Sequence, residues 1–422
     1  MSDQIKSVRG MPAILPGEVK KWQFVEAVAK NILHAYSYNE IRTPVVERSE
    51  LFQRTIGENT DIVAKEMYTF VDRNDQSLSL RPEATAGIIR AGIDQGFFYN
   101  QTQKLWSIGP MYRYERPQKG RYRQFHQINM EAFGFPGPDI DFEMILLTGR
   151  IWKALNLSPL QLELNSLGSP ESRKEYKRQL QDYFNDHQKE LDEDSLRRLG
   201  RNPLRILDSK NPDLQEIIES APKMVDFLDQ ESNEHFEGLM AMLQEHAIEY
   251  SLNTRLVRGL DYYTRTVFEW TTDQLGAQAT VCGGGRYDAL VAELGGKTTS
   301  AIGCAIGLER LIELVDVSDQ NEQNNPPKIY IVAVGSKAEE EGFVLAEELR
   351  DAYPNLSIEM NLNGGRFKQQ FKRADKAGAD IALILGDDEM RQQTVGVKPM
   401  RSEGHQETVD RKELLSIINK FL

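Results

Sequence analysis

The chain contains little cysteine and no long apolar run. Its two cysteines, Cys282 and Cys304, form neither a CxxC pair nor a metal-ligand spacing, so they fit reduced thiols better than a disulfide framework. No apolar stretch approaches the roughly 18 residues that a membrane-spanning helix needs. The first ten residues, MSDQIKSVRG, lack the apolar core of a signal peptide. We therefore expect a cytoplasmic protein with no membrane partner.

An excess of positive charge is also missing, since 51 Lys and Arg stand against 64 Asp and Glu. The net charge of −13 argues at first against a nucleic-acid partner. The basic residues nevertheless cluster: Lys104–His126 holds six of them against one acid, and 366–376 holds five against Asp375. Either cluster alone is typical of a solvated loop or helix face. Together they favour a protein that binds a polyanion at two places.

Hydrophobic patterning divides the chain into several parts. Residues 1–170 mix a helical pattern with strand-like runs, whereas about 171–250 shows charged helical periodicity broken by prolines, which predicts a helical insertion. The polar segment 317–327 ends in two prolines and predicts a linker. Beyond it, IYIVAV (329–334) and IALIL (381–385) are continuous apolar runs, as expected of strands buried on both faces of a small α/β domain.

The most informative segment is LVRGLDYYTRTVFEW at 256–270. It holds a permanent cation, Arg258, close to the paired phenols of Tyr262 and Tyr263 at the start of a strand-like run. Arginine binds phosphate oxygens with a planar fork, and tyrosine combines an apolar ring with a polar hydroxyl. Composition alone would equally fit an ordinary sheet edge.

A second segment, MYRYERPQKGRYRQFHQINMEAFG at 111–134, reads as strand, basic loop and strand. On its returning strand Gln127, Asn129 and Glu131 alternate to one face, with Met130 and Ala132 opposite. Three polar side chains on one face of a strand indicate a polar pocket rather than a solvated edge.

Three further segments carry candidate site residues, each of which also has a purely structural interpretation. In LSLRPEATAG (78–87), Glu83 precedes a helix-compatible run and fits a helix cap. In AIGCAIGLERLIEL (301–314), small residues precede an amphipathic helix and allow close backbone packing. CGGGRYDALV (282–291) is rich in glycine, but it matches neither a Walker loop nor a dinucleotide fingerprint.

LVRGLDYYTRTVFEW and CGGGRYDALV resemble the two signatures of the histidyl-tRNA synthetases, a family of class II aminoacyl-tRNA synthetases. The resemblance extends over essentially the whole chain. It implies an α+β catalytic core at 1–316 with an antiparallel sheet and the helical insertion, followed by the linker and an α/β anticodon-binding domain at 328–422. EIRTPVVER (40–48) resembles the class II motif at the dimer interface, so Pro44 implies a homodimer.

The resemblance also implies how residues divide among the substrates. The residues that would bind histidine are Glu83, Ala84, Thr85, Gln127, Glu131, Tyr262, Tyr263 and Tyr287, with Gly283–Gly285 beside them. The residues that would bind ATP are Arg113, Glu115, Arg121, Phe125, Arg258 and Arg310, of which Arg113 and Arg258 are the catalytic pair. The residues that would contact tRNA are Arg116, Gln118, Lys119, Arg123, Arg366, Lys368 and Lys372. Within 116–123, the ATP and tRNA roles remain interchangeable among the arginines.

The implied reaction is activation of histidine by ATP, followed by transfer to tRNA(His). The amino-acid carboxylate is already ionised at neutral pH, so its attack on the α-phosphorus needs no general base. Arg113 and Arg258 would stabilise the α-phosphate, while Mg²⁺ and Arg310 would hold the leaving pyrophosphate. The sequence shows no dense acidic cluster for a protein-bound metal.

Three alternatives remain at this point. The first is the synthetase-like regulatory subunit of ATP phosphoribosyltransferase, whose members lack the C-terminal domain and depart from the arginine signature. The second is a synthetase for proline or threonine, and the third is a non-catalytic tRNA-binding module. Arg258 and residues 328–422 argue against the regulatory subunit, and the LVRGLDYY stretch with the Glu131–Tyr263 pair argues against a synthetase for another amino acid. The presence of Arg113, Arg258 and Arg310 argues against a non-catalytic module.

Overall fold

The computed structural model describes residues 5–57, 60–200, 202–207, 209, 211–276, 279–316, 328–402 and 404–420. The chain divides into two compact units, Met1–Val315 and Asp316–Leu422. The expected linker at 317–327 lies outside the described residues.

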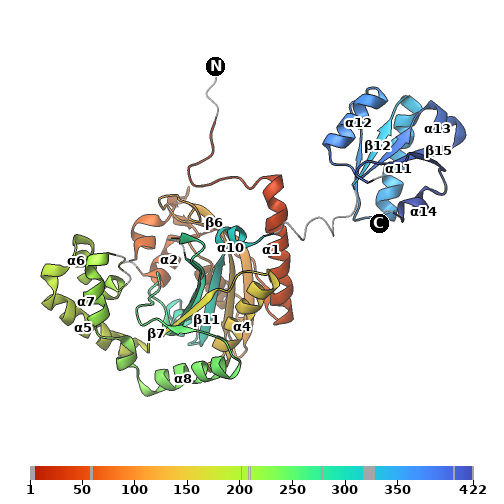
Figure 1. The fold of residues 1–422 in the computed structure, drawn as a ribbon. Helices are drawn as coiled ribbons and strands as arrows, with labels where there is room; N and C mark the ends of the chain where they lie inside the picture. The colour runs from red at the N-terminus through yellow and green to blue at the C-terminus, as the bar shows by residue number, and fades with distance from the viewer. Residues whose placement is uncertain are drawn as a thin grey trace. The chain divides into compact units, whose positions relative to one another are not determined.

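The first unit is built on a large mixed sheet (Figure 1). In the described part of the chain its eight strands lie in this order: β1 (Asn39–Glu40), β5 (Gln103–Tyr112), β6 (Gln124–Phe133), β11 (Ala301–Gly307), β10 (Thr280–Arg286), β9 (Thr264–Thr271), β7 (Gln161–Ser166) and β8 (Ser251–Leu252). The six strands from β5 to β7 pair antiparallel, as expected from the sequence. Only the two short edge strands of this sheet, β1 and β8, pair parallel to their neighbours.

Helices cover one face of this sheet. The helix α4 (Asp139–Ala154) contacts β11, α8 (Gln230–Glu245) contacts β9, and α10 (Leu308–Leu314) contacts β6. The N-terminal helix α1 (Pro16–Ala35) packs on α4 and α10 (Figure 1). Each helix turns apolar residues inward, such as Met144, Leu147 and Ile151 of α4, which are fully buried.

A small three-stranded sheet, in the order β2 (Val46–Arg48), β4 (Ser77–Leu80) and β3 (Thr69–Val71), lies beside α2 (Ser49–Ile56). Pro44 falls between β1 and β2, at the strand boundary that a proline predicts. The helix α3 (Thr85–Asp94) follows β4 and packs on α2. Its N-terminus brings Glu83 and Thr85 to the cavity described below.

The segment predicted to be a helical insertion contains α5 (Pro170–Asp186), α6 (Glu193–Leu199), α7 (Gln215–Ser220) and short 3₁₀ turns, among them η3 (Pro203–Ile206). It has its own core, in which Tyr176, Leu180, Phe184 and Ile206 are buried. The prolines that interrupt the helical pattern begin 3₁₀ turns at Pro203 and Pro212, where the missing N–H is tolerated.

The second unit has a five-stranded sheet in the order β13 (Ser357–Met360), β12 (Lys328–Ala333), β14 (Ile381–Leu385), β15 (Thr394–Pro399) and β16 (Glu407–Asp410). The first three strands are parallel and the last two antiparallel. Its helices are α11 (Ser336–Ala352), α12 (Phe367–Lys376), α13 (Asp387–Gln392) and α14 (Leu414–Ile418). The small α/β fold with a partly parallel sheet, predicted from its two apolar runs, is confirmed.

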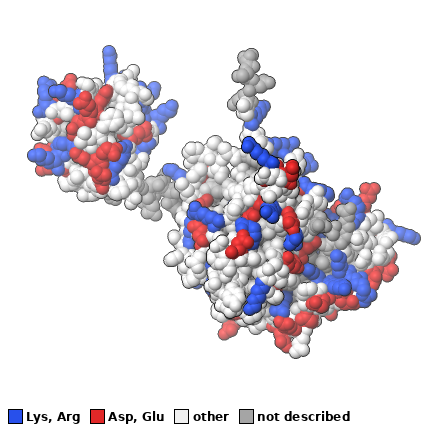
Figure 2. All heavy atoms as spheres, turned by 180° about the vertical axis from the view of Figure 1, so that it is seen from behind, with Lys and Arg blue, Asp and Glu red and all other residues white. Residues whose placement is uncertain are grey.

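One segment differs from its sequence pattern. The residue types from Leu252 to Trp270 are typical of a strand. Residues 253–263 nevertheless contain no strand, because they form turns that carry Arg258 and the paired tyrosines. The glycines 283–285 lie inside β10. Figure 2 shows Lys and Arg interspersed with Asp and Glu over the visible face, as the mixed composition suggests.

Candidate active site

A cavity of about 810 Å³ lies in the first unit. Eleven of the predicted site residues line it: Glu83, Thr85, Arg113, Glu115, Arg121, Phe125, Gln127, Arg258, Tyr262, Tyr263 and Arg310. They come from four separate segments, so the fold brings together residues that the sequence places more than two hundred positions apart.

The carboxyl group of Glu131 lies directly behind the cavity wall, next to the lining residues Thr85 and Gly303. Its side chain is fully buried on β6, where Thr85 donates a hydrogen bond to Oε1 at 2.6 Å and the Tyr287 hydroxyl donates to Oε2. Burial raises the pKa of Glu131 to about 8, although both hydrogen bonds act in the opposite direction. The carboxyl is therefore largely protonated at neutral pH, and a bound donor would favour its ionised form.

Gly303 on β11 makes room for this carboxyl. It pairs with Glu131 in register, and a Cβ on Gly303 would lie 1.6 Å from Oε2 of Glu131. Any side chain at this position would displace the carboxyl group. The glycine is therefore required by close approach, as its segment suggested.

Three tyrosines surround the same end of the site. Tyr262, Tyr263 and Tyr287 are buried, and the ring centroids of Tyr262 and Tyr263 are 4.6 Å apart, while those of Tyr262 and Tyr287 are 5.5 Å apart. Burial raises the pKa of Tyr263 to about 12, so its phenol remains protonated as a hydrogen-bond donor. This end of the site thus combines apolar ring faces and hydroxyls with the carboxyl of Glu131 behind them.

Glu83 lies at the N-terminus of α3. It accepts hydrogen bonds from the backbone N–H of Thr85 at 2.6 Å and of Ala86 at 2.9 Å, so it caps the helix, as the structural interpretation predicts. Burial raises its pKa, and these two backbone donors oppose the shift. Because Glu83 also lines the cavity, capping and ligand binding are compatible in one side chain. Ala84, between Pro82 and the helix, is buried.

Arg258 reaches across β10 towards β9. Its Nη1 forms an ion pair with Glu269, whose other oxygen accepts a hydrogen bond from Thr280 at 2.7 Å. A Cβ on Gly283 would lie 2.7 Å from both terminal nitrogens of Arg258, so glycine at 283 leaves the space that the guanidinium occupies. The buried Nε of Arg258 has no partner among the described residues. The cation is thus held from one side and open on another.

The other end of the cavity is basic and contains an aromatic ring. Arg113 lies over the ring of Phe125, with its guanidinium carbon 5.3 Å from the ring centroid, and donates to the carbonyl of Pro82 at 3.0 Å. Burial lowers the pKa of Arg113. Arg310 donates to the carbonyls of Gly120 at 3.1 Å and Thr280 at 2.6 Å. Glu115 and Arg121 form an ion pair at the same end.

The remaining predicted residues lie outside the cavity lining. Arg116, Gln118 and Lys119 are exposed in the loop between β5 and β6, and Arg123 lies over the ring of Tyr114, 3.8 Å from its centroid. In the second unit Arg366 precedes α12, and Lys368 and Lys372 are exposed on it one turn apart.

Comparison with known proteins decides the family. The family model for histidyl-tRNA synthetase matches residues 10–311, and that for an anticodon binding domain matches residues 328–421. The chain belongs to the histidyl-tRNA synthetase family. It is similar to apo histidyl-tRNA synthetase of S. aureus, with 34% identity over 99% of this chain and 100% of that chain and a TM-score of 0.81.

Two more distant structures share the fold of this family member. The histidyl-tRNA synthetase of Nostoc sp. is 20% identical over 99% of both chains, with a TM-score of 0.66. An ATP phosphoribosyltransferase regulatory subunit/histidyl-tRNA synthetase of Bacillus halodurans is 19% identical over 91% of this chain and 98% of that chain, with a TM-score of 0.64.

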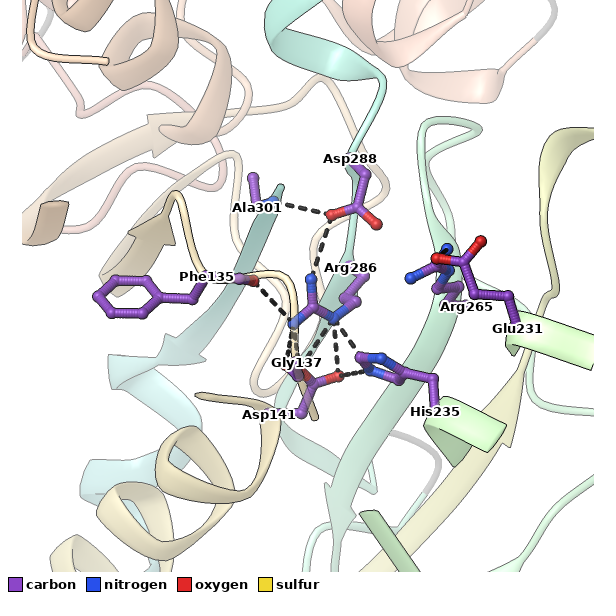
Figure 3. A network of polar contacts seen from close by, with 9 residues as sticks. All are labelled: Phe135, Gly137, Asp141, Glu231, His235, Arg265, Arg286, Asp288 and Ala301. Atoms are coloured by element: carbon purple, nitrogen blue, oxygen red, sulfur yellow. Dashed lines mark hydrogen bonds and ion pairs between the residues drawn. The ribbon is translucent and has the colours of Figure 1, made fainter. Parts of the chain in front are cut away.

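The second signature of this histidyl-tRNA synthetase family member also contains a structural arginine (Figure 3). Arg286, fully buried at the end of β10, donates from Nε to Asp141 at 2.9 Å, and Asp141 is also 3.1 Å from Nε2 of His235. Arg286 further donates to Asp288 at 3.2 Å and to the carbonyl of Phe135 at 3.1 Å. This network joins α4, α8 and β10 behind the glycine strand. Sequence reasoning gave Arg286 no role.

Sequence reasoning also missed contacts between the helical insertion and the signature loop. Arg173 of α5 donates to the carbonyls of Asp261, at 3.0 Å, and of Tyr263. Asn202 donates to the side chain of Asp261 at 3.1 Å. Arg205 of η3 and Arg255 both line the cavity. The charged pattern of 171–250 did not reveal these contacts, because it resembles that of any solvated helical segment.

The described residues contain neither a metal-type cluster nor a membrane-type helix. No three or more His, Cys, Asp or Glu side chains in that part of the chain are grouped so that they could hold a metal ion. No helix in it has the length and apolar character that crossing a membrane requires.

Proposed function

We propose that this chain is a histidine–tRNA ligase whose cavity binds histidine at its tyrosine-rich end and ATP at its basic end. One observation carries the proposal. At one end of the cavity Tyr262 and Tyr263 line it, and the buried carboxyl of Glu131 lies directly behind the lining residue Thr85. Three arginines from different segments, Arg113, Arg258 and Arg310, line the same cavity. The first arrangement suits a polar ring with N–H groups, and the second suits a triphosphate.

Histidine would enter with its ring towards Glu131 and the tyrosines. Glu131 accepts from one ring N–H, and the Tyr263 hydroxyl donates to the other nitrogen, so both ends of the imidazole are recognised. The amino group of the substrate lies towards Glu83 and Thr85, which line the same cavity. Gln127 on β6 supplies a further polar contact from the sheet. An analogue that lacks a ring nitrogen would leave a buried polar group unpaired, which opposes its binding strongly.

ATP would lie with its adenine ring on Phe125 and its adenine amino group towards Glu115. The carboxylate of histidine attacks the α-phosphorus, the bond to the β-phosphate oxygen breaks, and pyrophosphate leaves. Arg113 and Arg258 stabilise charge at the α-phosphate, and Arg310 stabilises the leaving group. For this step Arg258 changes its ion-pair partner from Glu269 to phosphate. A ribose hydroxyl of tRNA(His) then displaces AMP from the adenylate.

Mg²⁺ fits this site as an ion carried by ATP. The carboxylates around the basic end already have cationic or histidine partners, since Glu115 pairs with Arg121, Glu269 with Arg258 and Glu309 with His126. Mg²⁺ usually retains waters and binds substrate phosphates together with one or two carboxylates. When bound, it would neutralise phosphate charge, and the protein residues supply the remaining stabilisation.

The tRNA would contact both units. The loop between β5 and β6 presents Arg116, Gln118, Lys119 and Arg123 near the cavity for the acceptor end, with Arg121 able to take either role. In the second unit, Arg366, Lys368 and Lys372 form a basic edge of the anticodon-binding domain. Two observations support these contacts: the basic side chains are exposed, and residues 328–421 match an anticodon-binding family.

We expect a homodimer in the cytoplasm. Beside the Pro44 segment, the small sheet exposes apolar side chains, with Phe70 44% and Val71 63% accessible, and their burial against a second copy would remove this apolar surface from water. Sedimentation equilibrium of the wild type and of Val71→Lys tests the dimer. The free thiols Cys282 and Cys304 are both buried, which agrees with a reducing compartment.

The regulatory-subunit alternative is less well supported. The histidyl-tRNA synthetase model matches residues 10–311 of this chain, and an anticodon-binding model matches residues 328–421. Arg258 is also present and faces the cavity.

The test is ATP–pyrophosphate exchange with each of the twenty amino acids in turn, followed by charging of tRNA(His). Exchange stimulated by histidine alone supports the proposal. Stimulation by proline or threonine would indicate another synthetase, and no stimulation would indicate a binding protein.

A further inference from the structure

One part of the cavity has no ligand in the proposal above. Phe125, Arg113 and Arg310 belong to the end formed by β5, β6 and α10, and Arg258 lies over β10 and β9. Beyond them the cavity continues over the β7–β8 edge of the sheet, where Glu163, Asn253 and Thr271 line it. Adenine, the phosphates and histidine are all assigned elsewhere, so this edge is free for a third group.

The helical insertion forms the opposite wall of this part through η3. Arg205 of η3 lines the cavity, and a Cβ on Gly259 would lie 3.9 Å from one terminal nitrogen of Arg205 and 4.0 Å from the other. The guanidinium therefore lies over the glycine that follows Arg258. The described part of the chain offers Arg205 no ion-pair partner.

The turn that carries Arg205 is fixed from several sides. Arg198 donates to the carbonyl of Arg205 at 2.9 Å, and Arg255 donates to the carbonyl of Leu207 at 3.3 Å and to Gln215 at 2.9 Å. Asn202, just before the turn, bonds to Asp261 at 3.1 Å. An arginine whose backbone is held in this way loses less conformational freedom when it binds an anion.

We propose that the β7–β8 edge of the cavity receives the 3′-terminal nucleotide of the tRNA and that Arg205 binds its phosphate. The inference rests on the proposed function, because the second step of the ligase brings an RNA end to the adenylate. Among the described residues Arg205 has no carboxylate partner, and the ATP phosphates are already assigned to Arg113, Arg258 and Arg310. Glu163, held by Asn253 at 2.6 Å, is an acceptor for the hydroxyls of the terminal ribose.

The experiment compares Arg205→Gln with Arg205→Lys and with a matched control, Arg197→Gln. Arg197 belongs to the same insertion, is 70% exposed and does not line the cavity, so the control removes the same charge elsewhere. Two RNAs are used: the acceptor-stem hairpin of tRNA(His) and the same hairpin without its terminal nucleotide. Their dissociation constants are measured by fluorescence anisotropy at one salt concentration.

We expect Arg205→Gln to weaken binding of the complete hairpin about tenfold, on the scale of a lost charged hydrogen bond. Binding of the shortened hairpin should not change, because its phosphate is already missing, so the two changes are non-additive. Arg205→Lys should retain part of the affinity, and Arg197→Gln should affect both hairpins equally and slightly. Histidine-dependent pyrophosphate exchange by Arg205→Gln should stay within about twofold of wild type, which also shows that the variant is folded.

Three outcomes would overturn the assignment. Unchanged RNA affinity with reduced exchange would place an ATP phosphate on Arg205. An equal loss with both hairpins would place the contact away from the terminal nucleotide, and no change in either assay would leave Arg205 a solvated side chain. The RNA-binding comparison does not require the enzyme to be active. If the wild type shows no pyrophosphate exchange, the proposed function is wrong, and the binding of the two hairpins still tests the role of Arg205.

Discussion

Two arginines, one from each signature segment, differ in how completely the protein satisfies them. Arg286 is fully buried, and its guanidinium is surrounded by Asp141, Asp288 and backbone carbonyls. Within the part of the chain that the structure describes, Arg258 has one carboxylate partner and no partner for its Nε, and its side chain lines the cavity. Residue type is the same in both cases, so the remaining capacity for hydrogen bonds is what separates a structural arginine from one that is ready for a ligand.

The largest expected effect is on stability, from Arg286→Ala. Removing this side chain leaves the buried carboxylate of Asp141 without its main partner, which typically costs about 3–5 kcal/mol in unfolding free energy. Urea unfolding followed by circular dichroism measures it. The control is Glu231→Ala, which breaks the pair with Arg265 but removes a side chain that is 77% exposed, so stability should change by less than about 1 kcal/mol. If the two variants are equally stable, the network around Arg286 does not stabilise the protein more than an exposed ion pair does.

Arg258→Ala should act on catalysis instead. If this cation stabilises charge at the α-phosphate, adenylate formation should slow by about 10²–10³, as on loss of one preorganised donor. Single-turnover adenylation measures the rate, and urea unfolding should show a far smaller loss of stability than for Arg286→Ala. If the variant forms the adenylate at the wild-type rate, Arg258 is not a catalytic residue. Glu269→Gln is informative beside it, because it releases the cation without removing it.

The next effect concerns Glu131→Gln, which preserves shape and removes the acid. Histidine binding should weaken about 10- to 100-fold on loss of a charged hydrogen bond, while ATP binding is retained. Because the pKa of Glu131 is about 8 before the ligand arrives, an N–H donor that favours the carboxylate should expel roughly one proton on binding near neutral pH. Calorimetry in buffers of different ionisation enthalpy measures this release. A variant that releases as many protons as wild type would assign them to another group.

The raised pKa of Glu131 also makes the stability of the protein depend on pH. The folded protein holds the Glu131 proton up to a pH of about 8, whereas the unfolded chain loses it near the ordinary value of 4.5. Between these values the folded state binds more protons, so the contribution of Glu131 to stability decreases as pH rises through this window. The difference in unfolding free energy between wild type and Glu131→Gln should therefore shift against wild type with rising pH, and a flat difference would contradict the shift.

The smallest effects are expected at exposed cations. Charge reversal at Arg366, Lys368 and Lys372 should reduce tRNA charging and lower the slope of log affinity against log salt by about one unit for each lost phosphate contact. Pyrophosphate exchange should remain at wild-type level. Reversal of three cations outside α12, Lys337, Lys412 and Lys420, is the matched control. If both triple variants bind tRNA equally, α12 is a solvated face.

The sequence predicted what depends on local pattern and on signature residues. The apolar runs at 329–334 and 381–385 form buried strands, because a continuous apolar run is typical of a strand that is covered on both faces. Of the polar residues that alternate on the returning strand, Gln127 and Asn129 line the cavity, and Glu131 lies behind it. Partners that lie far apart in the chain were not predictable. Nothing local to Arg173 or Arg205 indicates that the insertion folds against the signature loop, and nothing local to Arg286 indicates that Asp141 is its partner.

Gly283 and Gly303 leave the middle of the large sheet without side chains, where adjacent strands of other proteins bury apolar residues. Arg258 and Glu131 occupy the space of the missing Cβ atoms, and the volume above them is where the amino acid is expected to bind. A substrate in that volume completes the interior of the protein, so occupancy adds to folding stability, by about 2.7 kcal/mol at a ligand concentration of one hundred times Kd. Amino-acid supply would then set the resistance of this chain to unfolding and proteolysis, and scarcity of histidine would lower the amount of the protein as well as its rate of work.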